Sequence, residues 1–368
     1  MTDSSVGPIR VIVAGTGWGC LAHVPALRAA GFEVAALVGN DRERTTDRAR
    51  RLNVPVATTS LEQALAVPGV RAAVIATPPS THYELASAVI AAGQHVLCEK
   101  PFTTSLDDAR SLLRQAEDAG VVHVLGQEMR WLKPQVGFAI ALADGLIGAP
   151  RFATFVRLSD AFADPAAEVP GWFTDKSGFG GWLNAEIPHT IDTVRTTLGE
   201  FASVTATACV TSDHDWATND SFAVQFTLVN GLVGIIQATQ GAFGPTAAVQ
   251  RISGTAGTIS VTAEGEIALD DASGRRLIEI PPEHQLGPAL DLPAGVAGSD
   301  AYARFEARAT RIPPATARLA AAFRDRILGV EPPKFPALPT FFDGVANTVV
   351  HQAIVTSATE GRTVTLGS

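Results

Sequence analysis

The sequence predicts an α/β domain with a doubly wound parallel sheet, followed by an α+β domain built on a large, mainly antiparallel open sheet. Short apolar runs alternate with helical segments as far as residue 125, and the first run ends in a glycine-rich turn. Beyond residue 134 the runs are long and strand-like, and Asn230-Gly231, a strong hairpin signal, joins two of them. We expect domains at residues 1–129 and 130–338, with a C-terminal helix and tail at 339–368 packing back on the body.

The alternation in the first domain sets the order of its elements. Gly31, Gly93 and Gly120 follow helical segments as C-terminal glycines do, and Ser60 and Ser105 stand where N-caps are expected. Because the connections are short, the strands should form one parallel sheet covered on both faces. The expected strands are residues 9–14, 32–38, 71–76, 95–98 and 121–125.

A glycine-rich turn directly follows the first strand and precedes a helix. In this context backbone N–H groups and the helix N-terminus can approach a pyrophosphate, which predicts a Rossmann dinucleotide-binding fold. A tight turn that binds nothing is the alternative. Cys20 occupies a position usually held by glycine or alanine. The expected cofactor contacts are Gly15, Gly17, Trp18, Gly19 and Cys20.

The end of the second strand bears on the choice of cofactor. An acid there normally binds the adenosine ribose hydroxyls, but this chain has Gly39. Without that carboxylate a 2′-phosphate is not repelled, and Asn40, Arg42 or Arg44 could contact it. NADP is therefore favoured over NAD. Against this, Asp41 lies only two positions later, and the arginines could belong to a solvated helix face.

Two further strand ends carry polar groups. The run Val96-Leu97-Cys98-Glu99-Lys100-Pro101-Phe102 delivers an acid and a base to a carboxyl end, where a partly desolvated lysine can act as a general base. A structural salt bridge is the alternative. The loop Thr77-Pro78-Pro79 ends the preceding strand, where cofactors lie in such sheets. His82 follows it, either as a structural histidine at a helix N-terminus or as part of the chemistry.

Bulk properties exclude several classes. The 28 basic and 37 acidic residues give a net charge of −9, so neither nucleic acid nor an anionic membrane is expected as a partner. Three widely spaced cysteines provide no disulfide or zinc framework and suit a reducing cytoplasm. The first residues show no secretory signal, and no apolar run approaches membrane-spanning length. We expect a cytoplasmic protein without a metal.

The second domain contains another candidate for chemistry. We expect a helix that begins at Pro188 and closes at Gly199, with His189 in its first turn, where the helix dipole favours the neutral ring. Asp192 can share the face of His189, and Glu186 can do so if the helix starts earlier. The strand-like stretches are residues 151–157, 203–210, 222–228, 233–236, 252–261 and 266–280.

Aromatic residues flank this helix, and the chain continues with a loop and further helices. Trp172 and Trp182 could stack on a sugar or cyclitol ring, although core packing explains them equally well. Residues 285–298 read as a loop that either closes over a substrate or merely connects. Helices are expected at residues 299–308 and 316–327 and, near the C-terminus, through Ala358. One face of the sheet needs covering, which favours a homodimer or homotetramer formed through it.

Several motifs resemble those of the glucose-fructose oxidoreductase, inositol dehydrogenase and rhizopine-catabolism (Gfo/Idh/MocA) family. The Glu-Lys-Pro motif is the most specific of them, and the likeness extends to Arg130, residues 145–148 and the far C-terminus. The motifs are Gly15-Thr16-Gly17, His23-Val24-Pro25-Ala26-Leu27, Ile75-Ala76-Thr77-Pro78-Pro79 with His82, and Gly93-Gln94-His95-Val96-Leu97-Cys98-Glu99-Lys100-Pro101.

This resemblance implies roles for the polar residues. Lys100 would hydrogen-bond the reacting hydroxyl and the nicotinamide ribose, His189 would serve as acid or base, and Glu99 would hold Lys100 in place. The Lys100–Pro101 bond could be cis and aim the lysine into the cleft. Many members carry an aspartate where this chain has Ala185. Glu186 or Asp192 could replace it, or the relay could run through Lys100 and His189 alone.

Three functions are compatible with these features. The first is an NAD(P)-dependent oxidoreductase that moves a hydride between the nicotinamide and a hydroxyl or carbonyl carbon of a sugar, cyclitol or related polyhydroxylated compound. The second is glycoside cleavage through transient oxidation with the same cofactor. The third is a non-catalytic dinucleotide-binding protein, since a fold does not determine a function.

Overall fold

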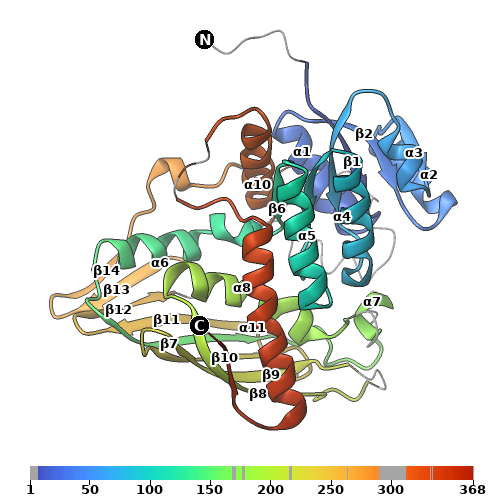
Figure 1. Cartoon of the computed structure of the whole chain (residues 1–368). Helices are drawn as coiled ribbons and strands as arrows, with labels where there is room; N and C mark the ends of the chain where they lie inside the picture. The colour runs from blue at the N-terminus through green and yellow to red at the C-terminus, as the bar shows by residue number, and fades with distance from the viewer. Residues whose placement is uncertain are drawn as a thin grey trace. The chain divides into compact units, whose positions relative to one another are not determined.

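The computed structural model describes residues 7–167, 171–175, 179–214, 218–262, 264–288, 290, 312–331, 333 and 335–367. The chain forms two compact units, each built from two segments (Figure 1). The first unit comprises Met1–Met129 and Leu286–Val345, and the second comprises Arg130–Gln285 and Ala346–Ser368. The helix expected at residues 299–308, and most of the loop expected at 285–298, lie outside the described residues.

The first unit contains a six-stranded parallel sheet in the order β3-β2-β1-β4-β5-β6. This is the doubly wound order, which reverses direction between β1 and β4, and ligands of such sheets bind outside the carboxyl ends of the strands at that point. The Rossmann prediction is confirmed. The strands are β1 Arg10–Ala14, β2 Glu33–Val38, β3 Val56–Thr58, β4 Val70–Ile75, β5 His95–Cys98 and β6 His123–Leu125.

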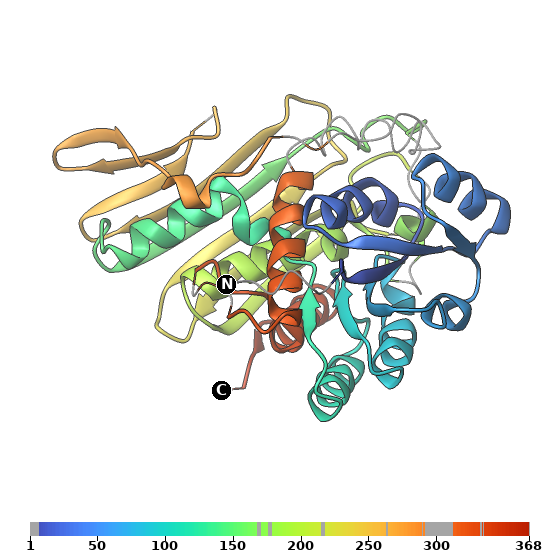
Figure 2. The ribbon, with the colours of Figure 1, turned by 90° about the horizontal axis from the view of Figure 1, so that it is seen from above.

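Helices cover both faces of this sheet, and α4 packs against α5 (Figure 2). The predicted caps are confirmed: the Ser60 hydroxyl accepts from the amide of Gln63 at 3.2 Å, and that of Ser105 accepts from Asp108 at 3.1 Å. A five-residue π-helical turn, Gly19–His23, precedes the first α-helix. The α-helices are α1 Val24–Ala29, α2 Arg42–Arg51, α3 Leu61–Leu65, α4 His82–Ala91, α5 Leu106–Asp118 and α10 Ile312–Ile327.

The second unit contains a nine-stranded sheet in the order β14-β13-β12-β11-β7-β10-β9-β8-β15. The β7 and β10 strands pair in parallel and the other neighbours are antiparallel, so the expected mainly antiparallel sheet is confirmed. The strands are β7 Pro150–Leu158, β8 Phe201–Cys209, β9 Ser221–Leu228, β10 Val233–Thr239, β11 Ala247–Gly254, β12 Gly257–Val261, β13 Ile267–Asp271, β14 Gly274–Leu277 and β15 Val364–Thr365.

Two strand predictions in this sheet need correction. Residues 252–261 do not form one strand, because the chain reverses between Gly254 and Gly257 and β11 pairs with β12 as a hairpin. Residues 266–280 likewise turn between Asp271 and Gly274, where β13 and β14 pair. Gly274 has a φ of +108°, a backbone conformation that favours glycine and that such a reversal uses.

The helices of the second unit pack on one face of its sheet (Figure 1). The α6 helix, Lys133–Ala143, lies against β12 and β13, and α8, Trp182–Thr197, lies against α6 and β9. The α8 helix begins six residues before Pro188, so the predicted helix start is wrong. Pro188 is inside the helix and buried, and tertiary packing outweighs the helix hydrogen bond that a proline cannot donate.

The C-terminal helix α11, Phe341–Glu360, contributes to the core of the first unit through its first turn. The Phe341 ring lies 4.5 Å from that of Phe102 and 5.1 Å from that of His123, measured between centroids. A Cβ atom on Gly344 would lie 2.5 Å from the Phe102 ring, so this position accepts glycine alone without repacking. After Val345 the helix belongs to the second unit, where β15 extends the sheet.

The described residues contain neither a candidate membrane-spanning helix nor a candidate metal-binding cluster. None of the helices there is long and apolar enough to cross a membrane. Among the same residues, histidine, cysteine and carboxylate side chains form no group of three that could hold a metal ion.

The contact between Gly344 and Phe102 predicts an inverted response to a helix-stabilising substitution. Glycine to alanine inside a helix normally gains roughly 1 kcal/mol. We expect Gly344→Ala instead to lower stability by about 1–3 kcal/mol, because its methyl group overlaps a packed ring. Thermal unfolding measures this, with Gly171→Ala as the control, since a Cβ on Gly171 meets no atom of the described residues within 4 Å. An unchanged or raised melting temperature for Gly344→Ala would contradict the packing described.

Candidate functional site

The glycine-rich turn lies where β1 meets the carboxyl end of β4. Gly15 has a φ of +118°, and a Cβ atom there would lie 2.2 Å from the carbonyl oxygen of Ala76, so only glycine allows this approach. Within the described part of the chain, the N–H groups of Thr16 and Gly17 donate to no other group. Such free amides next to a helix start suit a phosphate.

Cys20 belongs to the core rather than to a ligand surface. Its side chain is fully buried, and its N–H donates to the carbonyl of Gly17 at 3.0 Å within the turn. Burial raises the pKa of the Cys20 thiol to about 12, so the group is neutral at physiological pH. The thiol is therefore part of the core, and the expected cofactor contact at Cys20 stays a prediction that rests on its place in the glycine-rich turn.

Glu99 connects this turn to the end of β5. One of its carboxylate oxygens, Oε1, lies 2.7 Å from Nε2 of His23 and accepts from the indole N–H of Trp18 at 3.1 Å. Its other oxygen, Oε2, accepts from the backbone N–H of Lys100 at 3.1 Å. A Cβ atom on Gly126, directly after the neighbouring strand β6, would lie within 2.9 Å of this carboxylate. The glycine therefore leaves room for the carboxylate. Glu99 thus joins the cofactor turn to the candidate catalytic lysine.

The charge of Glu99 is compensated inside the protein. Burial alone would raise the pKa of Glu99, but the hydrogen bond and charge of His23, together with the charge and N–H of Lys100, outweigh it and lower the pKa below the ordinary value. The carboxylate is therefore ionised at neutral pH. The adjoining Lys100–Pro101 bond is cis, as the resemblance implied, and the Lys100 side chain is half-buried.

His82 joins the two neighbouring strand ends. Its ring is fully buried, with Nε2 2.8 Å from the carbonyl oxygen of Thr77 and Nδ1 2.9 Å from that of Pro101. The Thr77 hydroxyl accepts from Thr81 at 2.7 Å, and Pro78 is exposed while Pro79 is buried. A fully buried ring between two carbonyl oxygens fits the structural interpretation of His82, and its expected contact with a cofactor stays a prediction.

The end of β2 explains the missing acid. A Cβ atom on Gly39 would lie 2.2 Å from Oγ1 of Thr45 and 2.6 Å from Cγ2 of Thr16, so no side chain fits there. The Asp41 carboxylate, two positions later, caps α2 by accepting from the amide of Arg44 at 2.8 Å through Oδ1.

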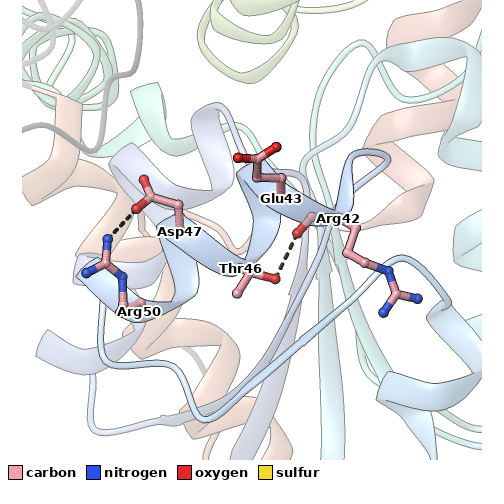
Figure 3. Close-up of a pocket in the computed structure, with 5 residues that line it drawn as sticks. All are labelled: Arg42, Glu43, Thr46, Asp47 and Arg50. Atoms are coloured by element: carbon pink, nitrogen blue, oxygen red, sulfur yellow. Dashed lines mark hydrogen bonds and ion pairs between the residues drawn. The ribbon is translucent and has the colours of Figure 1, made fainter.

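The two arginines beyond this cap differ in their contacts. Arg44 donates to the side-chain oxygen of Asn40 at 2.5 Å. The Arg42 guanidinium is exposed and has no hydrogen bond or ion pair among the described residues. Figure 3 shows it pointing away from Asp47 and Arg50, which form an ion pair on the same helix. Arg42 and that pair line a shallow pocket made by α2 alone, together with Glu43 and Thr46.

In the second unit, His189 lies near the middle of α8. It is the eighth helical residue rather than a first-turn residue, so the predicted effect of the helix dipole does not apply. Its side chain is 6% exposed. Ala185, one helical turn before His189, has no carboxylate in the position of the expected aspartate. Because the helix starts early, Glu186 and Asp192 each stand three residues from His189 on neighbouring positions of the helix surface.

Both acids are engaged elsewhere. Glu186 accepts from Arg157 of β7 at 2.8 Å. Asp192 receives two hydrogen bonds from Arg130, each 2.7 Å long, and a third from Asn347 at 3.2 Å. Each carboxylate thus already has a cationic partner, and replacement of the family aspartate by either of them stays a prediction.

The two tryptophans belong to an aromatic group. Trp182 makes an edge contact with Phe162 at 6.2 Å between centroids, and the Arg157 guanidinium lies 5.7 Å from its ring. Trp172 contacts Phe173, which in turn lies 4.9 Å from Phe162. Packing explains both residues, and the structure does not test their predicted role in substrate binding.

Sequence reasoning missed the partners of the two buried acids. His23 was recognised as part of a motif, but its contact with Glu99 spans 76 positions of sequence. Arg130 likewise lies 62 positions from Asp192. A signal was available in both cases: a buried acid in an apolar stretch needs a cationic or N–H partner, although a single sequence does not say which.

Two family models match the chain. The model described as an oxidoreductase family with an NAD-binding Rossmann fold matches residues 9–127, and the Gfo/Idh/MocA C-terminal domain matches residues 139–260.

Curated relatives carry oxidoreductase names. The chain is 33% identical over 178 residues to a 1,5-anhydro-D-fructose reductase of Ensifer adhaerens, covering 48% of this chain and 52% of that one. It is 30% identical to an uncharacterised oxidoreductase of Synechocystis, covering 55% and 54%, and thus spans about half the length of these two relatives. It is 26% identical to a levoglucosan dehydrogenase of Pseudarthrobacter phenanthrenivorans, covering 67% and 72%.

Solved structures share the fold of this chain. A levoglucosan dehydrogenase in complex with NADH has a TM-score of 0.81 at 24% identity, covering 98% of this chain and 100% of that one. An oxidoreductase of Agrobacterium radiobacter in complex with NAD⁺, L-tartaric acid and magnesium has a TM-score of 0.80 at 21% identity, covering 97% and 98%. These likenesses show the fold alone. Because one family supplies the models for both units, the chain belongs to the Gfo/Idh/MocA oxidoreductase family.

Proposed function

We propose that this protein is an NAD(P)-dependent oxidoreductase that transfers a hydride between the nicotinamide and a hydroxyl or carbonyl carbon of a sugar, cyclitol or related polyhydroxylated compound. The observation that carries this proposal is the Glu99 carboxylate, which holds the backbone of Lys100 and the glycine-rich turn together in one unit. Relatives named for levoglucosan and 1,5-anhydro-D-fructose support the substrate class.

The glycine-rich turn fits a dinucleotide. The close approach at Gly15 leaves room for a pyrophosphate, and the N–H groups of Thr16 and Gly17, which have no partner among the residues that the structure describes, suit it as donors. When bound, the cofactor supplies or accepts the hydride. The chain then has to orient the reacting carbon and move one proton, because oxidation of a hydroxyl releases both a hydride and a proton.

We propose that Lys100 orients the substrate and that His189 moves the proton. Lys100 hydrogen-bonds the reacting oxygen, where its positive charge stabilises the negative charge that develops as the proton leaves. Glu99 contributes by fixing the Lys100 backbone while keeping its own charge compensated. His189 accepts or returns the proton. The ion pairs of Glu186 and Asp192 favour a relay of these two groups without a carboxylate.

We propose NADP as the preferred cofactor. Three observations support it: Gly39 leaves no acid for the ribose hydroxyls, Asp41 is occupied as a helix cap, and Arg42 is exposed without a partner among the described residues. A 2′-phosphate would give the Arg42 guanidinium a charge-assisted, bidentate partner.

We also propose a homodimer or homotetramer formed through the sheet of the second unit. Ala153 and Phe155 are buried on the face of β7 that the helices cover. The alternation of the strand turns Phe152, which is 42% exposed, to the opposite face, and Val249 of the paired β11 is similarly exposed. Apolar side chains on an open sheet face favour burial by a second copy.

The role of Lys100 predicts a loss of turnover without loss of cofactor. Lys100→Met keeps the length of the side chain but removes its charge, so we expect kcat to fall by about 100- to 10,000-fold with nearly unchanged NADPH affinity. Stopped-flow or steady-state reduction of NADP⁺ with candidate polyols measures kcat, and fluorescence titration with NADPH measures the cofactor affinity. Lys133→Met is the control, because Lys133 forms a partly exposed ion pair with Glu266. Full activity of Lys100→Met would refute the assignment.

The stoichiometry of the same assay distinguishes a dehydrogenase from an enzyme that cleaves glycosides through transient oxidation. Equal amounts of reduced cofactor and product support the dehydrogenase. Cleavage of a glycoside without net reduction of NADP would instead favour transient oxidation.

The proposed cofactor preference predicts a selective effect at Arg42. Loss of a charge-assisted contact costs about 1.5–3 kcal/mol, so we expect Arg42→Ala to weaken NADPH binding about 10- to 100-fold and to leave NADH binding unchanged. Arg50→Ala on the same helix should change neither affinity, because Arg50 is already paired with Asp47. Equal effects of Arg42→Ala on both cofactors, or none, would exclude Arg42 as the reader of the 2′-phosphate.

A further inference from the structure

The Asp192 carboxylate accepts three hydrogen bonds inside the second unit. Arg130 donates from Nε to Oδ2 and from Nη2 to Oδ1, both at 2.7 Å, and Asn347 adds a 3.2 Å bond to Oδ1. The Arg130 and Asp192 side chains are only 6% and 3% exposed. A planar guanidinium bound at two points to a buried carboxylate fixes distance and orientation together.

The network continues from this pair toward solvent. Asn347 of α11 accepts from Nη1 of Arg195 at 2.8 Å, and Arg195 binds both oxygens of Glu200 at 2.8 Å. Arg195 is one helical turn beyond Asp192 on α8. Its partner Glu200 is 58% exposed, so the network has a buried inner part and a solvated outer part. The Arg195 side chain is only 5% exposed, so the outer pair is open to solvent on its carboxylate side alone.

The partners of Asp192, Arg130 and Asn347, lie next to the points where the chain passes from the first unit to the second. The first unit gives way to the second after Met129 and again after Val345. Arg130 is the first residue after one of these crossings, and Asn347 is the second residue after the other. One carboxylate on α8 therefore holds the two segments by which the chain enters the second unit. Asp192 also stands three residues beyond His189 on the same helix.

We propose that Asp192 is a positioning residue that fixes α8, and with it His189, to both chain crossings. The proposal rests on the function proposed above, in which His189 handles the proton. Asp192 itself transfers no proton, because its oxygens are held by Arg130 and Asn347. The anchor sets the position of His189 relative to the segments that connect it to the rest of the chain. A displacement of about 1 Å at such a group can cost 100-fold in rate.

The test compares Asp192→Asn and Asn347→Ala with the control Glu200→Gln, which alters only the outer pair. We expect Asp192→Asn to lower kcat about 10- to 100-fold, with a smaller loss for Asn347→Ala, while the cofactor KM and the shape of the pH profile stay unchanged. Glu200→Gln should behave as the wild type. Loss of one limb of the pH profile in Asp192→Asn would overturn the proposal, since it would make Asp192 a proton carrier.

Hydrogen exchange supplies a readout that needs no substrate. We expect faster amide exchange in residues 130–134, 346–350 and 189–196 in Asp192→Asn, and little change in Glu200→Gln. A lower melting temperature with unchanged kcat and unchanged exchange at these segments would reduce Asp192 to a structural role and refute the proposal. If none of the tested polyols supported reduction of NADP by the wild type, the proposed function would be refuted. Hydrogen exchange would still decide whether Asp192 anchors these segments.

Discussion

The buried charge of Glu99 is the constraint on which the first unit depends. A carboxylate without partners in a protein interior would cost several kcal/mol, so the residues around it must supply donors. They come from the glycine-rich turn through Trp18, from the helical turn that follows through His23, and from the end of β5 through the backbone of Lys100. The ends of β1 and β5, which are separated in sequence, are thereby held in one arrangement.

The sequence predicts most of the fold because local signals and burial agree there. Apolar runs and terminal glycines locate five of the six strands of the first unit to within two residues, and Ser60 and Ser105 locate two helix starts. The short strand β3 was not expected, and α10 begins four residues before its expected start. The helix start at Pro188 fails because its local signal opposes the tertiary one. Proline normally begins a helix, whereas here burial of the whole α8 face keeps it inside. Residues 252–261 and 266–280 were each expected to form a single strand, because a glycine at a turn cannot be distinguished in the sequence from a glycine within a strand.

For the candidate site, the sequence predicts which residues take part but not which of their charges are already paired. Motifs identify Lys100, His189 and the glycine-rich turn, because each combines a residue type with a position at a strand end or on a helix. Which acids are free for chemistry is a matter of long-range contacts. Glu186 and Asp192 look equivalent in sequence beside His189, but Arg157 and Arg130 engage them in the folded chain. With Ala185 in the family's acid position, the proposed chemistry depends on a lysine and a histidine alone.

The most direct test of this account is a kinetic comparison of Glu99→Gln with the wild type. A glutamine amide has one acceptor oxygen in place of two, so it cannot satisfy Trp18, His23 and the Lys100 amide together. If Glu99 joins the cofactor turn to the catalytic lysine, the substitution should raise the cofactor KM and lower kcat, each by about tenfold or more, as expected for lost bonds to a charged group. Wild-type values for both constants in a folded Glu99→Gln enzyme would contradict the account.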